Sequence, residues 1–214
     1  NKNIPVATLT LETIRDGFED IEYLAMAEKK IETALNALGI TEYSVDSLMD
    51  TYYKQLYKEG KIRAIGVSNF YADKITDFCL FNDIKPAVNQ IELHPFFQKV
   101  DEQKINNDLS VAVQSWASFA EGQNGIFKNE LLSQIGKKYG KTPAQVILRW
   151  LIERNVIVIP KTTRIERMRE NFAVFDFALS ADDKAKIATL DTNKTLFFDH
   201  RDPERIKWLA NYKV

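Results

Sequence analysis

Short apolar runs alternate along the chain with segments whose apolar residues recur every three or four positions. The short runs are rich in β-branched residues, which is typical of strands. They occupy Ile4–Leu9, Asp20–Leu24, Ile62–Val67, Ala87–Leu93, Val111–Trp116 and Val156–Ile159. The last run, VIVI, predicts a buried strand, and Pro160 ends it because proline has no backbone N–H to donate.

The intervening segments predict helices with recognisable ends. They cover Leu11–Gly17, Glu28–Leu38, Val45–Glu59, Asp73–Phe81, Glu102–Asn107 and Glu130–Tyr139, then a helix after Thr142 and one from Ser180 to Leu190. Glycines follow three of them, at Gly39, Gly60 and Gly140, where a left-handed residue closes a helix. Two helices begin with a hydroxyl cap, Thr142 before Pro143 and Ser180 before Asp183.

Strands that alternate with helices at this spacing predict parallel βαβ units and an α/β fold. The pattern alone leaves two architectures open, a doubly wound sheet and a closed barrel. No G-x-G-x-x-G fingerprint follows the first strand, which argues against a Rossmann dinucleotide site.

The segment from Val156 to Phe172 predicts an anion site. Lys161, Thr162 and Thr163 follow the strand, and the helix after them carries three arginines, with Ile165 and Met168 on an apolar side. A cation, hydroxyls and the positive end of a helix dipole together favour a phosphate. The alternative is a solvated basic helix.

Other polar residues also gather directly after predicted strands. They are Ser68 and Asn69, Glu92 and His94, and residues 116–121. In a barrel, the carboxyl ends of all strands face the active site. We therefore expect these side chains and Lys161 to share one rim.

Composition limits the possible partners. Basic and acidic residues nearly cancel, 29 against 30, so we expect neither nucleic acid nor an anionic membrane as partner. Cys79 is the single cysteine and lies on an apolar helix face, which predicts a core thiol. The two histidines, His94 and His200, lack the spacing of metal ligands, so no metal site is expected. We predict one cytoplasmic domain spanning residues 1–214, without a membrane span.

Several motifs in fixed order resemble the aldo-keto reductases, in particular their prokaryotic members similar to 2,5-diketo-D-gluconate reductase. The motifs are KEGKIRAIGVSNF at 58–70, PAVNQIELHP at 86–95, FAEG at 119–122, GKTPAQVILRW at 140–150, IPKT at 159–162, Arg167, and ENF at 170–172. The likeness runs from about Tyr57 to Leu209. It implies a (β/α)8 TIM-barrel fold and hydride transfer between NADP(H) and a carbonyl or alcohol.

The resemblance also assigns the cofactor contacts. Ser68, Asn69 and Gln90 would hydrogen-bond the nicotinamide carboxamide, and Trp116 would stack on the nicotinamide ring. Lys161, Thr162 and Arg167 would hold the adenosine 2′-phosphate, and Glu170 and Asn171 would contact the adenine. The resemblance gives His94 a structural role. The aromatic C-terminal run from Phe197 to Trp208 resembles the family's tail, which overlies the substrate pocket.

The N-terminal part departs from the family pattern. The family's catalytic set is Asp, Tyr, Lys and His, and the segment GFEDIEYLAMAE at 17–28 lies where the aspartate and tyrosine would be. Glu22 falls at the aspartate, and the tyrosine position falls near Met26, which cannot donate a proton. Tyr23 is displaced along the strand, so its side chain should face the other way.

The strands expected to carry the catalytic lysine and histidine are not recognisable, so six strands remain and the barrel looks incomplete. The chain could be trimmed or engineered, part of the parent sequence could be missing from it, or the fold could close in another way. Three functions stay open: an NADP(H)-dependent reductase of an aldehyde or ketone, a catalytically impaired NADP(H)-binding protein, and a fragment that dimerises through its open strand edges. For the first we expect a small carbonyl substrate and a monomer or weak oligomer.

Overall fold

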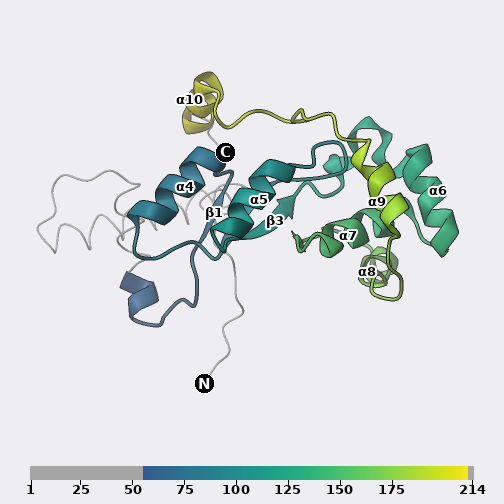
Figure 1. Cartoon of the computed structure of the whole chain (residues 1–214), viewed down its shortest axis with the longest axis horizontal. Helices are drawn as coiled ribbons and strands as arrows, with labels where there is room; N and C mark the ends of the chain where they lie inside the picture. Colours follow the sequence, from purple (N-terminus) through teal and green to yellow (C-terminus); the bar gives the residue numbers. More distant parts are fainter. Residues whose placement is uncertain (1–54, 212–214) are drawn as a thin grey trace, which may run out of the picture.

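The computed structural model describes residues 55–211 of the 214-residue chain. Within that range a parallel sheet of four strands has the order β1-β2-β3-β4 (Figure 1). The strands are β1 (Gly66–Ser68), β2 (Val88–Glu92), β3 (Ala112–Trp116) and β4 (Ile157–Val158). Each strand pairs with the next one along the chain, without the reversal of order that marks a doubly wound sheet. The predicted parallel α/β fold is confirmed, and the strand order is that of a barrel segment.

Several predictions concern residues outside the described part. They are the strands Ile4–Leu9 and Asp20–Leu24, the helices Leu11–Gly17 and Glu28–Leu38, and Glu22. Of the helix predicted over Val45–Glu59, residues 55–59 are described, and residues 55–58 are helical. Gly60 follows them with a φ of 70°, as expected for a glycine that closes a helix.

The strand register places alternate side chains on two different faces of the sheet. Ser68 pairs with Gln90, Gln90 with Gln114, and Glu92 with Trp116. Because side chains alternate along a strand, these residues share one face, which we call the polar face. Asn89, Ile91, Val113 and Ser115 lie on the opposite face and are buried.

Helices connect the strands and follow the last one. They are α4 (Ala72–Phe81), α5 (Val100–Asp108), the 3₁₀ segment η1 (Ala120–Lys128), α6 (Glu130–Tyr139), α7 (Pro143–Glu153), α8 (Ile165–Phe172), α9 (Ala181–Ala188) and α10 (Pro203–Asn211). Figure 1 shows α4 and α5 beside the sheet and α6 to α9 grouped at the other end of the molecule. None of the helices within residues 55–211 has the length and apolar character that crossing a membrane requires.

The core lies mainly under α6, α7 and α9. Val146, Ile147, Trp150 and Leu151 of α7 are buried, as the helical spacing predicts, and pack against Val113 of β3. Each such side chain contributes roughly 1.5–3 kcal/mol through burial. A smaller cluster under α4 contains Ile75, Cys79 and Val111, so Cys79 is a core thiol as predicted.

The caps of α7 and α9 are those predicted. The Thr142 hydroxyl accepts from the backbone N–H of Gln145, and the Gln145 side chain accepts in return from the N–H of Thr142. Ser180 and Asp183 form the same reciprocal pair at the start of α9. That helix ends at Ala188, two residues before the predicted Leu190. Gly140 closes α6 with a φ of 64°.

The strand predicted over Val156–Ile159 requires correction. It is a two-residue strand at one edge of the described sheet, and Ile157 and Ile159 are 41% and 53% exposed. The apolar side of α8 is also exposed, since Ile165, Met168 and Phe172 retain more than half of their surface. The apolar residues do recur at regular spacing, but spacing alone does not determine whether another element packs against them. The strand predicted over Ile62–Val67 likewise begins only at Gly66, where pairing with Val88 starts.

Candidate functional site

Hydrogen bonds join the four residues assigned to the nicotinamide end. Trp116 Nε1 donates to Asn69 Oδ1 at 2.8 Å, and Asn69 Nδ2 donates to Ser68 Oγ at 3.1 Å. Ser68 Oγ donates to the carbonyl oxygen of Gln90 at 3.1 Å, and the backbone N–H of Asn69 donates to the same oxygen at 2.8 Å. Three neighbouring strands therefore present one connected polar cluster at their carboxyl ends.

The loop after β1 carries Asn69 in a left-handed conformation, with a φ of 52°. Asparagine tolerates this conformation better than most residues. The buried Asn89 holds the loop: its Nδ2 donates to the Phe70 carbonyl at 2.7 Å, and its Oδ1 accepts from the Phe70 N–H at 3.3 Å. Asn106 of α5 accepts a further bond from Asn89 Nδ2 at 3.1 Å. Sequence analysis missed Asn89, although an asparagine on the buried face of a strand is a signal in itself, because buried amides need partners.

Gln114 was also missed. It lies on the polar face of β3, is 7% exposed, and accepts from Gln90 Nε2 at 2.7 Å. Because side chains alternate along β3, Gln114 lies on the same face as Trp116. This shared face could have identified Gln114 from the sequence.

The residues assigned to the adenosine end lie in the loop after β4 and on α8. Lys161 and Arg167 are exposed, and Thr162 Oγ1 accepts from the backbone N–H of Arg164 at 3.1 Å, just before α8 begins. Asn171 is partly exposed. The Glu170 carboxylate accepts from the Thr142 hydroxyl at 2.6 Å.

Polar contacts with α7, and not a buried apolar face, position α8. The buried Gln145 donates from Nε2 to the carbonyls of Glu170 and Ala173, at 3.1 and 2.9 Å. Lys141 Nζ donates to the same Ala173 carbonyl at 3.1 Å, and Arg149 donates to the Val174 carbonyl at 3.3 Å. These bonds hold the end of α8 and the two residues after it, Ala173 and Val174, against α7 and the turn that precedes α7.

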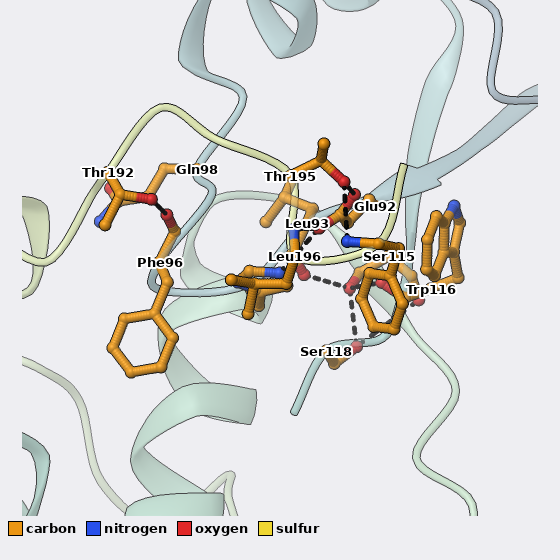
Figure 2. A network of polar contacts seen from close by, with 12 residues as sticks. Glu92, Leu93, Phe96, Gln98, Ser115, Trp116, Ser118, Thr192, Thr195 and Leu196 are labelled. Atoms are coloured by element: carbon orange, nitrogen blue, oxygen red, sulfur yellow. Dashed lines mark hydrogen bonds and ion pairs between the residues drawn. The ribbon is translucent and has the colours of Figure 1, made fainter. Parts of the chain in front are cut away.

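A C-terminal segment, residues 192–200, crosses the site; we call it the strap. Figure 2 shows its attachment to the end of β2 and the loop after it: Thr192 donates to the Phe96 carbonyl, and Thr195 Oγ1 and the Leu196 N–H donate to the Glu92 carboxylate at 2.5 and 3.0 Å. Phe197 and His200 then pack beside Trp116, with ring centroids 5.0 and 6.3 Å away.

Glu92 anchors the strap as a buried carboxylate. Burial by itself would raise the pKa of Glu92, but hydrogen bonds from His94, Thr195 and the Leu196 backbone outweigh it and lower this pKa. His94 Nε2 lies 3.1 Å from Glu92 Oε1, and the histidine is fully buried. The structure thus places His94 in the core behind the site.

A small cavity beside Asn69 is lined by Tyr71, Lys99, Glu92 and Glu102. The Tyr71 ring lies between Lys99 Nζ and the Arg201 guanidinium, 4.2 and 4.3 Å from its centroid. Lys99 pairs with Glu102 at 2.8 Å, and Asp199 accepts from the Tyr71 hydroxyl. Burial and the Asp199 charge raise the pKa of Tyr71 to about 12. This raised pKa makes Tyr71 a weaker proton donor than an ordinary phenol.

Comparison with protein families shows which family the chain resembles. Residues 42–123 and 120–192 match the model of the aldo/keto reductase family. A 9,11-endoperoxide prostaglandin H2 reductase of Trypanosoma cruzi is 40% identical over 144 residues, which are 67% of this chain and 51% of that protein. The methylglyoxal reductase DkgA of Escherichia coli is 39% identical over 142 residues, 66% of this chain and 52% of the relative. The resemblance inferred from the motifs, including its prokaryotic branch, is confirmed.

Solved structures agree with these matches. A mutant of Gox0644 in complex with NADPH has 34% sequence identity to this chain and a TM-score of 0.65, covering 69% of this chain and 54% of that one. The chain thus spans about half the length of the relatives it matches.

Proposed function

Since this chain belongs to the aldo/keto reductase family, we propose that it reduces an aldehyde or ketone to an alcohol with NADPH. The observation that carries the proposal is the connected cluster of Ser68, Asn69, Gln90 and Trp116 at the carboxyl ends of three parallel strands. The NADPH complex of Gox0644 supports the choice of cofactor.

The residues present fit a nicotinamide. A carboxamide offers one acceptor oxygen and two N–H donors, and the cluster offers hydroxyl and amide groups of both kinds. Trp116 supplies an aromatic face whose orientation the bond to Asn69 fixes. When bound, the cofactor supplies the hydride that adds to the substrate carbonyl. The strap residues Phe197 and His200, beside Trp116, would limit the access of water.

The adenosine end would lie along α8. Lys161, Thr162 and Arg167 would hold the 2′-phosphate through charge and a hydroxyl, and Asn171 would contact the adenine. Glu170 would contact the adenine from the same helix, while its carboxylate accepts a hydrogen bond from Thr142. Because Lys161 and Arg167 are exposed, we expect this part of the affinity to fall as salt is added.

The proton for the developing alkoxide needs a donor whose pKa is close to the working pH. Tyr71, with a pKa of about 12, is a poor candidate, so it gives no support for proton donation from this cavity. Glu22 at the aspartate position stays a prediction. The single domain, the cytoplasmic location, the absence of a nucleic-acid partner and the monomeric or weakly oligomeric state also stay predictions.

The test is a fluorescence titration with NADPH at low ionic strength, using variants of two tryptophans. We expect saturable quenching in the wild type. Trp116→Phe should lose most of the quenching and bind about threefold to tenfold more weakly, since it keeps an aromatic ring but loses the indole N–H bond to Asn69. Trp208→Phe on α10 is the control and should keep both signal and affinity.

Turnover is measured separately, as loss of NADPH absorbance with methylglyoxal and a panel of other aldehydes and ketones. Consumption of NADPH supports the reductase. Saturable binding without consumption would favour the catalytically impaired alternative, and a titration without any saturable signal would overturn the cofactor assignment itself.

A further inference from the structure

We propose that Gln114 is a positioning residue that fixes the direction in which the Gln90 amide is presented to the nicotinamide carboxamide. The inference rests on the proposed function. It concerns a residue that neither the sequence motifs nor the resemblance assigned.

The argument starts from the donors and acceptors along the cluster. An indole nitrogen can only donate, so the bond from Trp116 to Asn69 fixes Oδ1 of Asn69 as the acceptor and leaves its Nδ2 to donate to Ser68. The Ser68 hydroxyl proton is directed to the backbone carbonyl of Gln90, so this bond leaves the Gln90 side chain unconstrained. The orientation of these groups is therefore set before any ligand arrives.

Gln90 is the member whose amide could face either way, because its oxygen and nitrogen have similar shapes. Its Nε2 donates to Gln114 Oε1 at 2.7 Å. That bond leaves Gln90 Oε1 as an acceptor for a carboxamide N–H of the ligand. Without the bond, a half-buried glutamine would turn about its last torsion, and the two orientations would compete.

Position and burial separate the roles of the two glutamines. They are paired in register on the polar face, but Gln114 is 7% exposed whereas Gln90 is partly exposed. Gln114 therefore acts through Gln90. The distance of 2.7 Å lies at the short end of the range for N–H···O bonds.

The experiment compares two ligands in three proteins. NADPH is titrated against its 3-acetylpyridine analogue, which keeps the carbonyl but has no N–H to donate to Gln90. In the wild type we expect the analogue to bind about fivefold to tenfold more weakly, as loss of one hydrogen bond predicts. Gln114→Met removes the acceptor at similar size, and should lower this ratio about twofold or more, since only one of the two competing Gln90 orientations accepts from the carboxamide.

Gln114→Glu is the matched control because a carboxylate can only accept from Gln90 Nε2. It should keep the wild-type ratio. NADPH is used since its dihydronicotinamide ring is uncharged, so the added carboxylate does not attract it. Thermal unfolding of each variant is recorded, and Gln114→Thr, which is too short to reach Gln90, replaces Gln114→Met if that protein does not fold.

A general loosening of the fold would weaken both ligands equally and leave the ratio unchanged. The positioning role would be overturned if Gln114→Met kept the wild-type ratio of affinities for the two ligands. It would also be overturned if Gln114→Glu lost that ratio. Absence of NADPH binding in the wild type would instead reject the proposed function.

Discussion

Asp183 is a buried carboxylate that joins two helices. It accepts from the Ser180 backbone and hydroxyl, from Lys138 Nζ at 2.8 Å and from the Tyr139 hydroxyl, so it caps α9 and ties that helix to α6. Burial alone would raise the pKa of Asp183, but the bonds from Lys138, Ser180 and Tyr139 outweigh burial and hold this pKa well below its ordinary value.

The depressed pKa of Asp183 determines a pH dependence. The carboxylate stabilises the fold above the unfolded-state pKa of 3.8, and this stabilisation is lost as the pH falls below it. We expect Asp183→Asn to lower the free energy of unfolding by about 2 kcal/mol at pH 7, as loss of charged hydrogen bonds predicts. Denaturant titrations between pH 7 and 3 should show a flatter profile than in the wild type.

Asp182 provides the matched control for this comparison. It is 70% exposed and pairs with Lys186 on the surface of the same helix. Asp182→Asn should change the free energy of unfolding by no more than about 0.5 kcal/mol. Equal losses in both variants would contradict the role given to Asp183.

At the scale of single elements, α6 lies so close to the turn that follows it that a side chain would not fit between them. A Cβ placed on Gly136 would lie 2.3 Å from the carbonyl oxygen of Lys141. The same turn is closed by a 2.8 Å bond from the Lys141 N–H to the Gly136 carbonyl. Gly136 is therefore required by the approach of a neighbouring backbone, although it lies within a helix.

Gly136→Ala separates helix propensity from packing. Propensity predicts a gain of about 1 kcal/mol when alanine replaces a helical glycine. The close approach predicts a loss of about 2–3 kcal/mol, because a backbone atom must move. We expect the loss, measured by denaturant unfolding, with the exposed Lys137→Ala as control. A Gly136→Ala protein more stable than the wild type would show that the turn moves to accommodate the added methyl group.

Helix ends that depend on residues close in sequence were predicted correctly. Strand bounds and contacts that depend on distant segments were not. The bounds of α6 and the cap of α7 are correct because Gly140, Thr142 and Pro143 act within a few residues. The bounds of β1 and β4 were wrong because a strand exists only where a neighbour pairs with it. The polar residues at strand ends were found as single groups, but the bonds from Gln114 to Gln90 and from Asn89 to the Phe70 loop join distant segments.

At the scale of the whole molecule, apolar side chains remain exposed on α8 and on the edge strand β4. Met168 and Phe172 are 57% and 77% exposed, and Ile157 and Ile159 lie on or beside the short edge strand. Sequence analysis predicted the Val156–Ile159 strand to be buried and placed Ile165 and Met168 on an apolar side of the following helix, a pattern that normally marks a covered face.

Substitution on α8 tests whether this face is exposed in solution. Since little surface is buried there, Phe172→Ser should change the free energy of unfolding by no more than about 0.5 kcal/mol and reduce the fluorescence of a bound apolar dye. Ile147→Ala in α7, which is fully buried, is the contrast and should lose about 2–5 kcal/mol. A comparable loss in Phe172→Ser would mean that this face is covered.

The attachment of the strap to Glu92 has a consequence for proteolysis. Lys194 is exposed and directly precedes Thr195, so a trypsin-like protease could cut the strap between these two residues. The cut would disconnect the Thr195 hydroxyl and the Leu196 N–H, which both donate to Glu92, from the preceding part of the chain. A buried carboxylate would then face His94 with two fewer donors, and Phe197 and His200 could leave Trp116. A single nick would thus uncover the indole ring while the sheet beneath it stayed folded.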